Sequence, residues 1–203
     1  MKKGTFSTRT IAFTAVMSAM VAVATMVLKI QTGESYTNLG DAVIFLTASF
    51  FGPIPGLIAG GLGSFLADLI TYPTTMWFTL GIKGLEGLIA GLFVYVANKY
   101  VQGSEKKDKI IRYAIYVLGM VVAAAWMVGG YYVAKAFSYG TKESALVSLP
   151  KNCVQGSLSI VIAVILYGVL YPFAQKYIIK VDKSKLEEKE ETNDDTNVKS
   201  ESL

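Results

Sequence analysis

The sequence predicts an all-α integral membrane protein with six transmembrane helices, and two observations lead to this prediction. First, 53% of the 203 residues are hydrophobic and only 17% are charged, with a mean hydropathy of +0.46, a composition typical of membrane proteins. Second, the apolar residues gather in several runs, most of them long enough for membrane-spanning helices. One domain, residues 1–181, holds these runs. We expect residues 182–203, which are highly charged and lack aromatic residues, to form a disordered cytoplasmic tail.

The first predicted helix runs from about residue 10 to residue 28. Its basic start resembles a signal peptide, but its apolar run is longer than the core of such a peptide, so we expect the helix to be retained. Ala15 and Ala19 lie four residues apart on it, and their small side chains form a stripe that another helix can approach closely. The stripe serves either packing within the chain or a partner interface, and the pattern leaves both open.

The second and third predicted helices are short. Residues 42–51 form an apolar run too short to cross a hydrocarbon core of about 30 Å unless the helix extends back through Leu39. A polar loop at 30–40 precedes it. The third helix, residues 57–70, has small residues at four-residue spacing beginning at Gly56, which favours close helix packing. Two short helices beside a polar loop predict an indented structure with a cavity.

The fourth predicted helix, from about residue 76 to residue 97, carries Lys83 and Glu86 in the middle of its apolar run. An ionised side chain at the centre of a membrane costs roughly 2.5 to 3.5 kcal/mol, so these residues need a partner or a polar cavity. Because they are three residues apart, both side chains lie on one helical face. An ion pair that only orients helices is one interpretation, and a polar site inside a helix bundle is the interpretation that we favour.

The fifth and sixth predicted helices run from about residue 115 to 136 and from about 149 to 179, with a polar loop at 138–148 between them. Basic residues gather at the N-terminus, in the loop at 98–112 and after the sixth helix. Because lysine and arginine are enriched in cytoplasmic loops, we predict that both termini are cytoplasmic.

Several kinds of chemistry are disfavoured by what the sequence lacks. Histidine is absent, which removes the commonest general base and metal ligand, and the single Cys153 excludes an internal disulfide and a cysteine metal cluster. No phosphate-binding Gly-x-x-x-x-Gly-Lys-[Ser/Thr] pattern and no Gly-x-Ser-x-Gly elbow occurs. We therefore predict that the protein is not an enzyme, and that it needs no metal, cofactor or nucleic acid.

The polar residues at membrane depth gather towards the predicted outer half of the helices, where they are expected to face one outward site. Asn152 and Gln155 share a helical face, and amides suit the hydrogen-bonding edges of heterocycles because each offers donors and an acceptor. Lys83 is expected to contact the ligand, with Glu86 holding it in place. The candidate binding residues are Asn38, Lys83, Glu86, Trp126, Tyr131, Asn152 and Gln155, while Asp41 and Asp68 lie at compatible depths.

Four segments together resemble the S components, the substrate-binding subunits, of energy-coupling factor (ECF) vitamin importers. They are Asn38–Ala42, Phe51–Asp68, Phe78–Gly87 and Leu149–Gln155. The resemblance covers about residues 8 to 180 and is closest to the riboflavin and hydroxymethylpyrimidine type. Lys151 departs from the pattern, because a small residue is expected before the asparagine.

This resemblance implies that the protein captures a B-vitamin or vitamin precursor, such as hydroxymethylpyrimidine, riboflavin or a pyridoxine-like compound, from outside the cell. It also implies a multi-pass location in the cell membrane, surrounded by lipid, and association with a transmembrane coupling subunit and two ATPase subunits. Ala15 and Ala19 match the family's coupling-subunit contact. The alternative is a membrane assembly or interaction protein without a small-molecule substrate.

Overall fold

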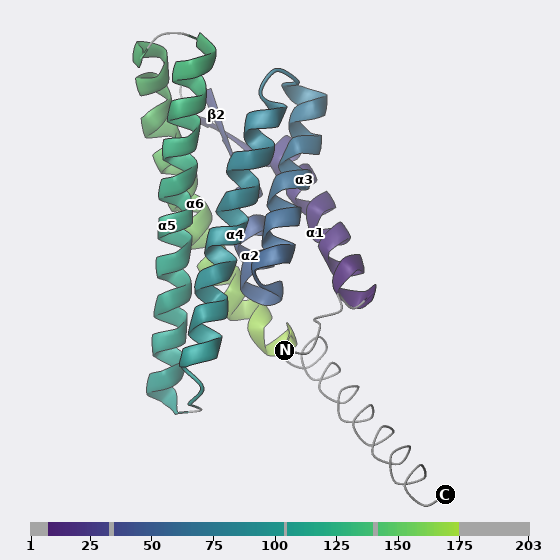
Figure 1. Ribbon diagram of the computed structural model, residues 1–203, viewed down its shortest axis with the longest axis vertical. Helices are drawn as coiled ribbons and strands as arrows, with labels where there is room; N and C mark the ends of the chain where they lie inside the picture. Colours follow the sequence, from purple (N-terminus) through teal and green to yellow (C-terminus); the bar gives the residue numbers. More distant parts are fainter. Residues whose placement is uncertain (1–7, 33–34, 104, 140–141, 175–203) are drawn as a thin grey trace, which may run out of the picture. The chain divides into compact units, whose positions relative to one another are not determined.

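A computed structural model describes residues 8–32, 35–103, 105–139 and 142–174, which form six helices and one β-hairpin (Figure 1). The chain divides into two compact units, residues 1–164 and 165–203, and the site described below belongs to the first. The predicted tail at 182–203 and its boundary with the membrane domain lie outside the described residues. The elements are α1 (Thr8–Val27), β1 (Lys29–Thr32), β2 (Ser35–Asn38), α2 (Gly40–Phe51), α3 (Pro53–Thr71), α4 (Met76–Tyr100), α5 (Lys106–Tyr139) and α6 (Lys142–Ala174).

The prediction of six helices is confirmed, and five of them (α1, α3, α4, α5 and α6) are long and apolar enough to cross a membrane. The sixth, α2, has only 12 residues, which corresponds to a length of about 18 Å. All of its residues from Gly40 to Ser49 except Val43 are buried. This short helix is therefore an interior element, packed against α1, α3 and α4.

The segment at 30–40 was predicted to be a polar loop, and this prediction was wrong. β1 and β2 pair as an antiparallel hairpin in which Lys29 lies opposite Asn38. The Leu39 amide then donates to the Leu28 carbonyl oxygen, 3.2 Å away. Polarity along the segment hid a strand signal, since half of the eight strand residues are β-branched or aromatic types that favour strands: Ile30, Thr32, Tyr36 and Thr37. The hairpin brings Asn38 directly to the start of α2.

Helices α5 and α6 begin earlier than predicted, at Lys106 rather than 115 and at Lys142 rather than 149. Helix α4 also continues to Tyr100, so much of the predicted loops at 98–112 and 138–148 is helical. Hydropathy marks the part of a helix that lies in the membrane, whereas lysine and arginine are good helix formers that extend helices beyond it. The predicted end of the last helix, at 179, lies outside the described residues.

Glycine brings α3 and α4 into backbone contact, and these two helices pack more extensively than any other described pair. A Cβ atom at Gly56 would lie 2.5 Å from the Gly87 carbonyl oxygen, and one at Gly60 would collide with the Lys83 carbonyl oxygen. The turn before α3 also requires glycine, because Gly52 has φ +87° and Pro53 then starts the helix. The close packing of helices that the small residues on α3 predicted is therefore confirmed. It also positions Lys83 in the interior.

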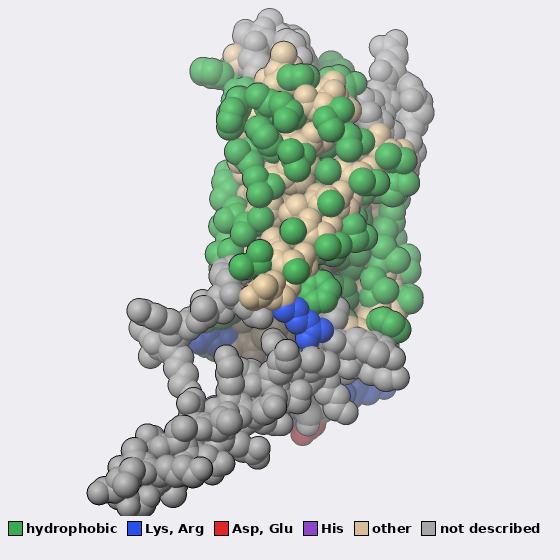
Figure 2. All heavy atoms as spheres, turned by 90° about the vertical axis from the view of Figure 1, so that its right-hand side faces the viewer, with side chains coloured by type: hydrophobic (Ala, Val, Ile, Leu, Met, Phe, Trp, Pro, Cys, Tyr) green, Lys and Arg blue, Asp and Glu red, His purple; other side chains and the backbone are tan. Residues whose placement is uncertain are grey.

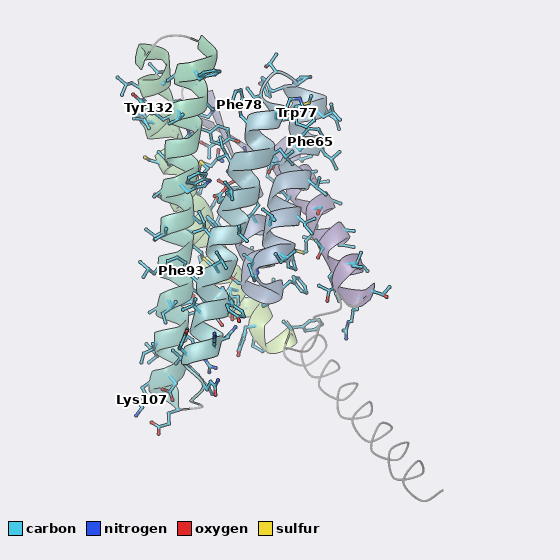
Figure 3. The ribbon with its side chains drawn as sticks, in the orientation of Figure 1. Phe65, Trp77, Phe78, Phe93, Lys107 and Tyr132 are labelled. Atoms are coloured by element: carbon cyan, nitrogen blue, oxygen red, sulfur yellow. The ribbon has the colours of Figure 1, made fainter. Side chains whose placement is uncertain are left out.

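Large side chains cover the outside of the helices. On the face shown in Figure 2, hydrophobic side chains cover most of the described surface, and blue basic side chains lie only near its lower end. Phe65 and Trp77 pack with their ring centroids 5.2 Å apart near the α3–α4 turn, and Trp77 and Phe78 are exposed (Figure 3). Phe93 lies between α4 and α5, where it fills the space beside Gly119 (Figure 3).

Candidate functional site

Lys83 lies between two carboxylates inside the protein. Its Nζ atom is 2.5 Å from Asp41 Oδ1 and 2.9 Å from Glu86 Oε2, and the exposed fractions of Lys83, Asp41 and Glu86 are 4%, 1% and 0%. Lys83 and Glu86 come from one face of α4, whereas Asp41 lies in the first turn of α2, where the helix dipole favours a negative charge. Buried charges require partners. Here the partner of Lys83 on α2 is Asp41, so their ion pair joins α2 to α4.

Gln155 connects the charged residues to the hairpin. Its Nε2 donates to Asp41 Oδ2 over 2.9 Å, and its Oε1 accepts the Asn38 backbone N–H over 3.5 Å. The Asn38 side chain in turn accepts the Gly40 amide at 3.0 Å, at the start of α2. Elements far apart in the sequence therefore meet at one set of residues. We call this set the polar cluster: Asn38, Asp41, Lys83, Glu86 and Gln155.

Tyr131 joins the polar cluster to a second set of hydrogen bonds. Its ring centroid is 5.6 Å from Lys83 Nζ, a cation–π arrangement, and its hydroxyl lies 3.1 Å from Thr79 Oγ1. Thr79 donates to Asp68 Oδ2 over 2.5 Å, and Thr75 donates to the same oxygen over 3.2 Å. These contacts link α3, α4 and α5 on one side of Lys83.

Trp126 and Asn152, the other two predicted binding residues, make none of the hydrogen bonds described above. The Trp126 indole is 41% exposed and donates to the Ile82 carbonyl oxygen, 3.2 Å away, next to Lys83 in the sequence. Trp126 thus fastens α5 to α4. Asn152 is buried on α6, one helical turn before Gln155 and on the same face.

Some buried polar atoms in and beside the polar cluster have no hydrogen-bond partner among the described residues. In native proteins most buried polar atoms are paired, and an unpaired one costs about 1–3 kcal/mol. Such atoms are candidates for ligand contacts. They are Thr37 Oγ1 on the hairpin, Glu86 Oε1 on α4 and Asn152 Nδ2 on α6, while Ser159 Oγ is a fourth example further along α6.

Asp41 is the residue that the predicted binding set omitted. It accepts hydrogen bonds from both Lys83 and Gln155 and is therefore the centre of the polar cluster. The sequence offered a signal for it, because a carboxylate immediately before an apolar helix at membrane depth needs a partner. The sequence did not show that this partner is Lys83, because the two residues are 42 positions apart.

The two alanines predicted at a partner interface, Ala15 and Ala19, are exposed on α1. The buried face of α1 consists of other residues, including Ser18 and Val21, and a Cβ atom at Gly63 of α3 would lie 2.5 Å from the Ser18 carbonyl oxygen. The close packing of α1 against α3 thus uses a different face from the Ala15–Ala19 stripe. That stripe is left on the surface of the described residues.

Comparison with known proteins gives consistent matches. The family model for the S component of the ECF-type riboflavin transporter matches residues 5–172. An uncharacterized protein of Pyrococcus woesei is 38% identical over 144 residues, covering 70% of this chain and 88% of that protein. A UPF0397 protein of Streptococcus agalactiae is 30% identical over 158 residues, covering 77% and 82%.

A solved structure has the same fold. It was reported as "Structure and mechanism of the S component of a bacterial ECF transporter", and it superposes with a TM-score of 0.59 over 81% of this chain and 96% of that chain. The two sequences are 20% identical, so this likeness concerns the arrangement of the helices.

Proposed function

Because this chain belongs to the family of S components of ECF-type riboflavin transporters, we propose that its polar cluster is the site where it captures a B-vitamin or vitamin precursor. An S component is the substrate-binding subunit of its transporter and not an enzyme. The protein is accordingly a multi-pass protein of the cell membrane.

One observation carries the proposed location of the site. Glu86 is completely buried, yet one oxygen of its carboxyl group has no partner among the described residues. Leaving such an atom unpaired in a membrane protein is costly unless something else binds it. Asn152 Nδ2, which also has no partner in the described part of the chain, and the Tyr131 ring beside Lys83 supply the further polar and flat surfaces that a heterocycle needs. Hydroxymethylpyrimidine, riboflavin and pyridoxine are flat rings with hydrogen-bonding groups at their edges, so all three suit these surfaces.

We expect the purified protein to bind at least one of riboflavin, hydroxymethylpyrimidine, thiamine and pyridoxine. Isothermal titration calorimetry in detergent measures this, with saturation at one ligand per chain. A protein unfolded by heating serves as the control for partition of the vitamin into micelles. If the folded protein binds none of the four compounds, the proposed ligand class is wrong.

The family implies a vitamin substrate and partners within an ECF module, and we propose that these partners are a transmembrane coupling subunit and two ATPase subunits. The exposed Ala15–Ala19 stripe supports a contact with the coupling subunit, since its two small side chains allow another helix to approach the α1 backbone closely. The proposed orientation, with both termini in the cytoplasm, puts the basic residues around Lys107 on the same side as the ATPases.

We expect the double variant Ala15→Leu and Ala19→Leu to keep its vitamin affinity and to lose its partners. Two leucines would push an approaching helix away from α1 without touching the buried face. Copurification from a host that carries an ECF module measures the loss. The matched control is Ala125→Leu, an exposed alanine on α5, which should copurify normally. Normal copurification of the double variant would place the partner contact elsewhere.

The alternative function, a membrane assembly protein without a small-molecule substrate, predicts the opposite pattern. It would copurify with other membrane proteins, bind no vitamin, and tolerate loss of the Glu86 carboxylate in every assay except stability. The two experiments above therefore separate the two functions.

A further inference from the structure

We propose that Glu86, rather than Lys83, is the ligand-facing member of the polar cluster, and that it selects neutral or cationic heterocycles which donate a hydrogen bond to it. In the same proposal, Asn152 donates to an acceptor atom of the ligand. The inference rests on the proposed function, and it narrows the class of substrate.

The ammonium group of Lys83 has its contacts within the protein. It donates to Asp41 and to Glu86, and the ring of Tyr131 covers it at 5.6 Å. An ammonium has three donors, so two are used and the third meets an aromatic face. The expectation that Lys83 contacts the ligand therefore has less support than a role in holding the two carboxylates at a fixed separation.

Glu86 has the complementary arrangement. Lys83 binds one carboxyl oxygen, Oε2, and orients the group, while the other oxygen, Oε1, has no partner among the described residues. An ionised carboxylate only accepts hydrogen bonds. A ligand that reaches Oε1 satisfies it with an N–H, an O–H or a positively charged nitrogen.

Asn152 and Gln155 show the same contrast on α6. Both atoms of the Gln155 amide are used, by Asp41 and by the Asn38 backbone, whereas the Asn152 Nδ2 has no partner in the described part of the chain. An amide nitrogen donates hydrogen bonds, so the ligand must supply an acceptor there. Gln155 is thus a structural amide, and Asn152 is available for the ligand.

The charge balance also selects the ligand. The polar cluster contains two carboxyl groups and one amine, all buried. Ionised, it has an excess of negative charge that repels a carboxylate or phosphate placed beside Glu86. The ligand class that fits is a neutral or cationic heterocycle that carries both a hydrogen-bond donor for Glu86 and an acceptor for Asn152.

The first test uses the wild-type protein, so it does not depend on the folding of a variant. The vitamin that binds in the calorimetric panel is compared with its analogue in which the donor hydrogen is replaced by methyl, as in 3-methylriboflavin for riboflavin. We expect the methylated analogue to bind at least about tenfold more weakly, the loss expected for one hydrogen bond to a charged group. Equal affinity would overturn the proposal that the ligand donates at this site.

The second test uses variants of the protein. We expect Glu86→Gln and Asn152→Asp each to bind the vitamin at least about tenfold more weakly. Ser157→Ala is the matched control, because it removes an exposed hydroxyl from the same helix and should bind normally. Thermal unfolding of each variant shows whether it is folded. Normal affinity in a folded Glu86→Gln variant would exclude Glu86 as the selecting group.

These outcomes separate the inference from the function on which it rests. Vitamin binding that is insensitive to donor methylation and to Glu86→Gln leaves capture of a small molecule intact and removes only the role of Glu86. Absence of binding to the whole panel removes both.

Discussion

Lys83→Met is expected to lower the free energy of unfolding by about 3–5 kcal/mol, the range measured when one partner of a buried ion pair is removed. The substitution leaves Asp41 and Glu86 buried without the ammonium that both of them bind. Methionine nearly fills the volume of the lysine side chain, so the loss reports the charge rather than a cavity. Thermal or chemical unfolding in detergent measures the effect, and vitamin affinity should fall with it because Glu86 loses its orientation.

Two controls show whether the buried charges are responsible. Lys107→Met removes a lysine whose ion pair with Glu105 is exposed, and exposed pairs contribute only about 0–1 kcal/mol. The triple variant Asp41→Asn, Lys83→Met and Glu86→Gln removes all three charges. It should recover much of the lost stability, because replacing a complete buried ion set by neutral groups is often nearly neutral. A triple variant as unstable as Lys83→Met would contradict the electrostatic explanation.

Gly87→Ala is expected to destabilise the protein by about 1–3 kcal/mol, the usual cost of overpacking. Its new methyl group would overlap the Gly56 carbonyl group of α3, and a backbone cannot move aside as a side chain can. Separation of α3 from α4 would also shift Glu86, the preceding neighbour of Gly87, so ligand affinity should fall as well. Unfolding temperature and calorimetry measure the two effects.

Gly81→Ala is the matched control on the same helix. A Cβ atom at Gly81 meets nothing within 4 Å, so the substitution should be neutral or stabilise by up to about 1 kcal/mol, as alanine is the better helix former. Opposite signs for the two substitutions would establish that backbone contact, and not glycine content, holds α3 against α4. Similar destabilisation by both would show that the close α3–α4 contact is not the cause.

The helices were predictable from the sequence because their signals are local. Apolar runs gave the number of helices and their order, and four-residue spacing of small residues identified the face of α3 that meets α4. The ends of α5 and α6 were not predictable from hydropathy, because helices continue beyond the membrane on residues that hydropathy treats as loop. The hairpin was missed because its polar residues obscured its strand propensity.

Four of the five residues of the polar cluster were predicted as binding residues, whereas Asp41 and the roles of the individual residues were not. Burial in a membrane makes any charged residue conspicuous, which singled out Lys83 and Glu86. Their face on α4 followed from helical periodicity. The sequence could not distinguish the amide of Gln155, which is hydrogen-bonded at both atoms, from that of Asn152, whose nitrogen has no partner in the described part of the chain. Both residues have the same chemistry and lie on the same face of the same helix.

By itself, therefore, the sequence determined that this is a six-helix membrane protein with ionisable groups in its interior, and its motifs indicated the family. Composition, periodicity and the cost of burying charge are properties of residues and of short segments, and they can be evaluated without knowing the fold. Only the tertiary structure decided that Asp41 is the second partner of Lys83, that Gln155 also binds Asp41, and that one oxygen of Glu86 has no partner among the described residues. The contact of Lys83 with Asp41 joins residues 42 positions apart, and that of Gln155 with Asp41 joins residues 114 positions apart. Pairing over such separations depends on how the helices pack, and no local pattern specifies which of several polar groups at one depth will meet.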